Sequence, residues 1–250
     1  MAGLAFRDFK TRYLNSFLGA MWAVINPIAT IAVYTFIFSE VMQAKLPNLD
    51  QTWAYSVYLC SGLLTWQYFV ETIQRLQNVF VEQNNIIKKV SFPKVTLPIY
   101  VMLSSTLNFS IVFIVFLVFL AGIGHFPGLE IIWVLPLFII QQSLALGIGL
   151  MVGTLNVFFR DFGHFSNIFI QFWFWFTPIV YTIQIVPDKF KSIISINFII
   201  PIFQSYQSLF LYNKVPNWEE LKPVVLITVV LLGLAYMIFQ KLKNEMVDEL

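Results

Sequence analysis

The chain has 250 residues, of which 58% are hydrophobic and only 11% are charged, with a mean hydropathy of +0.77. Soluble domains carry roughly 25% charged residues. This chain therefore has too little polar surface to cover a core in water, and we predict an integral membrane protein. The net charge of +2 comes from local clusters, which argues against a nucleic-acid partner.

The amino-terminal segment, residues 4–19, has the pattern of an amphipathic helix that lies in the membrane interface. Its aromatic residues recur at helical spacing, and its basic residues fall mostly on the other side. The aromatic residues are Phe6, Phe9, Tyr13 and Phe17, and the basic residues are Arg7, Lys10 and Arg12. Because charge stands where a signal peptide would be apolar, we expect no signal peptide. The helix is either a simple anchor or a basic gate for an anionic lipid head group.

A helix that crosses the hydrocarbon needs about 20 mainly apolar residues. Five segments meet this requirement cleanly or nearly so, and a sixth is short but wholly apolar. They are 21–42, 53–70, 95–124, 131–159 and 162–186, followed by 223–239. A seventh candidate, 193–212, is interrupted by Asn197, Pro201 and several other polar residues. Lipid-facing backbone must satisfy its own hydrogen bonds, so this segment suits a re-entrant or interfacial hairpin better than a span.

We therefore predict one all-α membrane domain, residues 1–250, with six transmembrane helices. An amino-terminal interfacial helix precedes the first span, and an external hairpin, residues 187–215, precedes the last. Six spans place twice as many Lys and Arg residues on the inner side as on the outer side, as the positive-inside rule requires. Seven spans give the same ratio, so the charge count does not separate the two. The interruption at Asn197 and Pro201 favours six spans, with both termini cytoplasmic.

A polar segment, residues 82–94, stands between two long apolar runs and reads EQNNIIKKVSFPK. Both topologies place it in the cytoplasm. A conspicuous hydrophilic segment in a chain so poor in charge predicts that something in the water binds it. The alternative is an ordinary cytoplasmic loop, whose lysines follow the topology and whose Pro93 ends a helix.

Several kinds of chemistry find no support in the sequence. No Gly-x-x-x-x-Gly-Lys-Ser/Thr loop occurs to hold nucleotide phosphates, and no Cys/His cluster has metal-site spacing. Ionisable residues are almost absent from the predicted spans, which argues against an ion-coupled carrier. Glu71 and Arg75 lie four residues apart, a spacing typical of a pair within one helix.

Five stretches carry a family resemblance, and together they span most of the chain in family order. They read RDFKTRYLNSFLGAMWAVINP at 7–27, LCSGLLTWQYF at 59–69, NNIIKKVSFPKVTLP at 84–98, LNVFFRDFGHF at 155–165 and FTPIVY at 176–181. With these stretches the chain resembles the membrane subunit of a type-2 ABC exporter. Within that group it is similar to the bacterial permeases for O-antigen and related polysaccharides.

The resemblance implies two copies of a six-span subunit around a channel, driven by a separate pair of cytoplasmic ATPase subunits in the bacterial inner membrane. ATP and Mg would belong to those partners, so we expect no cofactor, no metal and no catalytic residue in this chain. The substrate would be an undecaprenyl-pyrophosphate-linked polysaccharide, moved among membrane lipids.

The resemblance also assigns tasks to particular residues. The polar segment would couple the chain to the ATPase, with apolar anchors and charged residues of the kind that protein interfaces use. These coupling residues are Asn84, Asn85, Ile86, Ile87, Lys88, Lys89, Phe92 and Pro93. Arg7, Lys10 and Arg12 would meet the lipid pyrophosphate, because phosphate favours such cations. Arg160-Asp161 matches a family pair, but Asp161 is more simply an N-cap of the fifth span.

Aromatic residues make up 18% of the chain. Their faces suit the apolar C–H patches of sugar rings, so an aromatic wall would pass a sugar polymer without trapping it. The candidates for such a channel lining are Tyr13, Trp22, Trp173, Trp175 and Tyr181. A membrane-interface belt is an equally good explanation for any one of them. Ala145, Gly149 and Gly153 recur every four residues and predict close helix packing. The hairpin is expected to gate the external mouth.

Three alternatives stay open at this point. A type-2 ABC exporter of teichoic acid, lipid or drug would have the same general pattern. A membrane-embedded enzyme acting on lipid-linked sugars would need a carboxylate or histidine constellation at one membrane face, and none is visible. An ATP-independent channel is the third.

Overall fold

The computed structural model describes residues 19–42, 46, 51, 53–84, 88 and 93–249. Within these ranges every secondary-structure element is helical, which confirms the all-α class. The elements are η1 (Gly19–Met21), α2 (Trp22–Thr35), η2 (Phe36–Val41), α3 (Ala54–Glu82), α5 (Thr96–Gly122), η3 (Leu129–Trp133), α6 (Val134–Phe158), α7 (Asp161–Trp175), η4 (Ile183–Ile185), α8 (Asp188–Ser195), α9 (Ile200–Tyr212), α10 (Trp218–Leu242) and α11 (Met246–Glu249).

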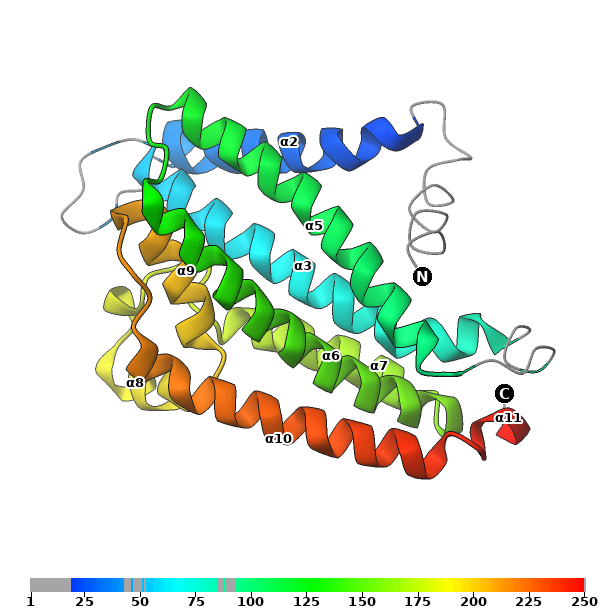
Figure 1. The fold of residues 1–250 in the computed structure, drawn as a ribbon. Helices are drawn as coiled ribbons and strands as arrows, with labels where there is room; N and C mark the ends of the chain where they lie inside the picture. Colours follow the sequence, from blue (N-terminus) through cyan, green and yellow to red (C-terminus); the bar gives the residue numbers. More distant parts are fainter. Residues whose placement is uncertain are drawn as a thin grey trace.

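The long helices lie roughly along one axis and alternate in direction (Figure 1). Helices α2 and α5 run one way, while α3, α6 and α10 run the opposite way. The carboxyl ends of α3, α6 and α10 gather with the amino end of α5 at one end of the bundle, which we call the α11 end. The carboxyl ends of α2 and α5 gather at the other, which we call the α8 end.

Helix α3 occupies the centre of the bundle, in contact with α2, α5, α6, α7 and α9. It buries apolar residues such as Phe69 and Ile73, but also several polar side chains. Most of these are satisfied by helix backbone: Thr65 Oγ1 donates to the Ser61 carbonyl at 2.7 Å. Gln141 of α6 donates to the Thr65 carbonyl at the same distance. A helix enclosed by other helices does not face lipid, so it can carry such groups.

Four helices within the described residues are long and apolar enough to cross a membrane, or five if the bent pair α8 and α9 forms one span. The four are Trp22–Ser39, Thr96–Gly122, Leu129–Phe158 and Trp218–Leu242. They confirm helices at the predicted spans 21–42, 95–124, 131–159 and 223–239. The predicted span 53–70 coincides with the first part of α3. Because α3 contains many polar residues, it is not apolar enough to be counted with these four helices. Six spans therefore stay a prediction.

The predicted fifth span, 162–186, is wrong over its second half. Helix α7 ends at Trp175, and irregular turns follow as far as the short helix η4. At about 1.5 Å per residue, α7 is roughly 22 Å long and does not reach across the hydrocarbon on its own. Thr177 and Pro178 fall just after its end, and proline cannot continue the backbone hydrogen bonding of a helix.

The interruption predicted around Asn197 and Pro201 is present. Helix α8 ends at Ser195, α9 begins at Ile200, and the two axes differ by 106°. Helix α9 then packs into the core, where Phe203, Tyr206 and Phe210 are fully buried. Helix α8 buries only Ile194 and exposes most of its other residues. The hairpin is thus one core helix preceded by one surface helix.

Candidate transport site

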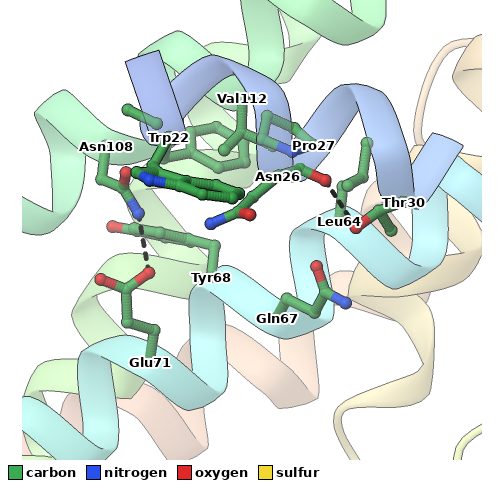
Figure 2. A pocket seen from close by; sticks show the side chains of 12 residues that line it. Trp22, Asn26, Pro27, Thr30, Leu64, Gln67, Tyr68, Glu71, Asn108 and Val112 are labelled. Atoms are coloured by element: carbon green, nitrogen blue, oxygen red, sulfur yellow. Dashed lines mark hydrogen bonds between the residues drawn. The ribbon is translucent and has the colours of Figure 1, made fainter. Parts of the chain in front are cut away.

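A cavity of about 340 Å³ lies between α2, α3 and α5 (Figure 2). It lies about halfway along the bundle, because its α3 residues, from Leu64 to Glu71, straddle the middle of that helix. Its walls combine aromatic, amide and carboxylate side chains with aliphatic ones. The residues are Trp22, Ala23, Asn26, Pro27, Thr30, Leu64, Gln67, Tyr68, Glu71, Asn108, Phe109 and Val112.

Glu71 is the ionisable residue of this cavity. Its Oε2 accepts a hydrogen bond of 2.8 Å from Asn108 Nδ2 (Figure 2). One turn further along α3, Arg75 donates to the hydroxyls of Ser104 and Ser105 at 3.1 and 3.2 Å. The sequence suggested that Glu71 and Arg75 pair within one helix, and the structure adds that both reach across to α5. An ionisable group at such a depth in a membrane protein is a functional candidate by default.

The aromatic candidates for a channel wall occupy different environments. Trp22 lines the cavity and is 38% exposed, and Trp175 at the end of α7 is 60% exposed. Trp173 is buried in the core of the chain, where its indole N–H donates to Asn197 Oδ1 at 2.8 Å. Tyr181 is half-buried, and its hydroxyl donates to the Trp175 carbonyl at 2.8 Å. Tyr13 lies outside the described residues.

Asn197 joins the end of α7 to the hairpin. Besides accepting from Trp173, its Nδ2 donates to the Phe176 carbonyl at 3.1 Å and to Thr177 Oγ1 at 2.9 Å. From α3, the Tyr58 hydroxyl contacts the carbonyl of Tyr181 at 2.9 Å. The irregular stretch between α7 and α8 is therefore held by specific side chains rather than by helix backbone.

The predicted coupling segment is described only in part. Asn84 is half-buried just after α3, while Lys88 and Pro93 are exposed. Asn85, Ile86, Ile87, Lys89 and Phe92 lie outside the described residues, as do Arg7, Lys10, Arg12 and the whole predicted interfacial helix before Gly19. Gly19 itself has a φ of +52°, the left-handed conformation expected at the end of a helix.

A small apolar cluster lies at the α11 end, where the carboxyl end of α3 meets the amino end of α5. It contains residues from α3, α5, α6, α10 and α11, namely Leu76, Val79, Phe80, Leu97, Val101, Val157, Phe239 and Met246. Phe80 and Phe239 stack with their ring centroids 5.7 Å apart. Lys94, just before α5, donates a hydrogen bond to the carbonyl of Lys243, just after α10. Both flanks of the coupling segment therefore rest on one shared core.

The glycines predicted to allow close packing in α6 do so against α3. A Cβ on Gly153 would lie 2.3 Å from the Leu76 carbonyl oxygen, and one on Gly149 would lie 2.6 Å from Leu76 Cβ. The N-cap predicted for Asp161 is wrong: Asp161 lies in the first turn of α7, and the cap position is Arg160 without a side-chain hydrogen bond. The start of α7 is held instead by Asn156 and Gln77, which both bond the backbone of Gly163.

Residues 2–211 match the family model described as the ABC-2 type transporter. The match covers well over half of the chain. The chain belongs to the ABC-2 type transporter family.

Relatives in this family match over almost the full length. The O-antigen export system permease protein RfbA of Klebsiella pneumoniae is 34% identical over 243 residues, covering 97% of this chain and 91% of the relative. The RfbA protein of Myxococcus xanthus is 27% identical over 252 residues, covering 100% and 95%. The polysialic acid transport protein KpsM of Escherichia coli is 20% identical over 249 residues, covering 97% and 93%.

The sequence predicted Trp22 as a residue of the channel wall in this ABC-2 family member, but it did not predict the other residues that line the cavity with Trp22. Asn26, Gln67, Tyr68 and Asn108 come from three helices, and no spacing within the sequence connects them. The available signal was weak: each is a polar or amphipathic residue inside an otherwise apolar run. Gln67 lies in the stretch LCSGLLTWQYF, which carries part of the family resemblance. Nothing in that stretch predicts which residues of α2 and α5 lie beside Gln67.

Proposed function

We propose that this chain is the membrane subunit of an ATP-driven exporter that moves a lipid-linked, O-antigen-type polysaccharide out of the cytoplasm. The observation that carries the proposal is the near full-length similarity to two O-antigen export permeases, the closer at 34% identity. The polysialic acid transport protein extends the similarity to a second polysaccharide. The polar and aromatic cavity inside an apolar helical bundle gives a sugar-compatible surface within the membrane domain.

The exporter would contain a second copy of this chain and a pair of cytoplasmic ATPase subunits, which bind ATP and Mg. It would lie in the bacterial inner membrane, with six spans and both termini in the cytoplasm. The alternating helix directions support this topology, because they bring the flanks of the 84–93 segment and the end of α10 to the same end of the bundle (Figure 1). The substrate carrier would be an undecaprenyl pyrophosphate, met by Arg7, Lys10 and Arg12.

The ATPase would act on the segment from Asn84 to Pro93. The exposed Lys88 and Pro93 support a docking surface there. The apolar cluster at the α11 end gives a physical route for the movement, since α3, α5, α6 and α10 share it. A displacement of the segment would therefore move four helices together, because packed side chains transmit strain.

The channel wall would use Tyr13, Trp22, Trp175 and Tyr181, and the hairpin at 187–215 would gate the external mouth. Trp175 supports this role because its ring is 60% exposed in the protomer. Trp173 is left out because its ring is buried. The single side chain of Asn197 joins α7 to the hairpin, so a movement of α7 would reach the gate through it.

Complementation tests the proposal directly. The chain is expressed, with and without the ATPase encoded beside it, in a bacterium that makes O-polysaccharide but lacks its own permease. We expect surface polymer only when both are present and none when the ATPase carries an inactivated phosphate loop. Intracellular accumulation of polymer despite both proteins would contradict polysaccharide export. Export without the ATPase would support an ATP-independent channel instead.

A further inference from the structure

The cavity between α2, α3 and α5 contains more polar groups than the packing of three membrane helices requires. Tyr68 is 4% exposed, and its buried hydroxyl lies within reach of the Thr72 and Thr106 side chains, which do not line the cavity. The hydroxyl of Tyr68 is therefore satisfied inside the protein, and the polar groups that the cavity offers are those of its amide and carboxylate side chains.

Two amides add to this surplus. Asn26 of α2 and Gln67 of α3 are exposed to the cavity (Figure 2). Asn108 of α5 donates one amide N–H to Glu71, and this bond fixes the orientation of its amide group. Figure 2 shows Asn26 and Asn108 beside Trp22, while the amide of Gln67 lies nearer to Thr30 along the same cavity. Three amides provide donors and acceptors at fixed places, which is what a ring of hydroxyl groups needs.

The aromatic part of the cavity complements the polar part. Trp22 keeps 38% of its surface exposed and Tyr68 contributes a second ring. Aromatic faces pack against apolar C–H surfaces, while amides and carboxylates bond the polar rim. The volume of about 340 Å³ lies at the lower end of the range for small-molecule sites, roughly 300–1,000 Å³.

The same lining disfavours other ligands. Among the described residues that line the cavity there is no Lys, Arg or His, so it does not suit a pyrophosphate. A single carboxylate is a poor site for a divalent cation. An acyl or isoprenoid chain would leave the amides unsatisfied, and a neighbouring apolar groove of about 830 Å³ between α2 and α5 suits it better. An ammonium head group would use the acceptors but leave three amide N–H groups facing a cation.

We propose that this cavity, within one protomer, binds a single neutral sugar ring of the transported polymer. Trp22 packs against one face of the ring, and the amides of Asn26, Gln67 and Asn108 bond its hydroxyl groups. Glu71 orients Asn108. The inference rests on the proposed function, since it assigns the polymer of that function a defined subsite.

The test measures binding by the purified full-length chain in nanodiscs made of phosphatidylglycerol. The probe is polysaccharide released by mild acid from the carrier of the complemented cells. Asn26→Leu and Gln67→Leu remove one amide each, and neither side chain makes a hydrogen bond to another described residue. We expect each to weaken binding roughly five- to ten-fold. Trp22→Ala should weaken it about ten-fold or more, and Trp22→Phe should recover most of that loss.

Asn244→Leu makes the same chemical change as Asn26→Leu at an exposed position in the turn after α10. It should bind as the unsubstituted chain does. Thermal unfolding and expression of all variants establish that they fold. A second set of nanodiscs containing phosphatidylethanolamine distinguishes an ammonium head group, because that lipid would then compete with the polymer. Such competition would overturn the sugar assignment.

The outcomes separate the subsite from the function. If the chain restores export but folded cavity variants bind the polymer as tightly as Asn244→Leu does, the subsite is wrong and the exporter stands. If the chain restores no polymer export, the proposed function fails. Saturation-transfer NMR with methyl glycosides then tests the cavity by itself, and a signal equal in the unsubstituted chain and Gln67→Leu overturns the subsite.

Discussion

The backbone N–H of Gly163 donates a hydrogen bond of 3.0 Å to Oδ1 of Asn156, across the turn between α6 and α7. Asn156 Nδ2 in turn donates to the Gln77 carbonyl at 3.1 Å, and Gln77 Nε2 donates to the Gly163 carbonyl at 3.1 Å. Three helices are thus joined by one closed set of buried polar contacts. The set lies at the α11 end, next to the apolar cluster that contains Leu76 and Val157.

Asn156→Leu should destabilise the protein by about 2–4 kcal/mol. The substitution leaves the Gly163 N–H and the Gln77 carbonyl buried without this partner, and each such loss costs about 1–3 kcal/mol. Reversible unfolding of the purified chain in mixed micelles measures the change. Asn244→Leu serves as the control and should stay within about 0.5 kcal/mol of the unsubstituted chain. Equal stability of the two variants would show that the contacts at Asn156 hold nothing together.

Gly153→Ala should be more harmful than its single methyl group suggests. The new Cβ would meet the Leu76 carbonyl oxygen at 2.3 Å, and backbone cannot move aside as a flexible side chain can. Overpacking of this kind costs about 1–3 kcal/mol. Gly233→Ala, in α10, is the matched control because nothing lies within 4 Å of its added Cβ. That control should be neutral or more stable by up to about 1 kcal/mol, since alanine favours helix. Melting temperatures that fall equally for both would contradict the packing argument.

Charge reversal in the coupling segment should weaken the association with the ATPase. Lys88 is exposed, so Lys88→Glu leaves the fold intact while it inverts the charge that the partner meets. We expect the double variant, Lys88→Glu with Lys89→Glu, to bind the ATPase roughly ten-fold more weakly, mostly because association is slower at low salt. Surface plasmon resonance with the immobilised permease measures the rates. Lys189→Glu, in α8, makes the same change at the opposite end of the bundle and should leave binding unchanged. A double variant that binds and drives export normally would remove the lysines from the docking surface.

Asn197→Leu should release the stretch between α7 and α8. The change removes the acceptor of the Trp173 indole and the donor to Phe176 and Thr177. Hydrogen exchange of residues 176–199, followed by mass spectrometry, should become at least about ten-fold faster, because local opening costs less when side-chain bonds are lost. Asn197→Asp keeps the acceptor and should give an intermediate rate. Exchange that stays slow in the Leu variant would show that α8 and α9 are held by their packing alone.

Prediction from the sequence succeeded where the signal was local. The spans 95–124 and 223–239 contain helices because a long apolar run in a membrane protein must satisfy its backbone internally. The break near Asn197 was visible for the same reason, since polar residues and proline interrupt such a run. The end of α7 was missed because the apolar composition continues past Trp175 into a stretch that is not helical.

The amino-acid sequence was enough to predict an all-helical membrane protein, the positions of four of its apolar helices and the family that it resembles. Those properties follow from composition, from the period of a single segment and from the order of local motifs. The central position of α3, the link from Gln77 through Asn156 to Gly163, and the cavity shared by Trp22, Gln67 and Asn108 became visible only in the folded chain. Each of these depends on which faces of separate helices meet, and that is set by side-chain packing between segments far apart in the chain.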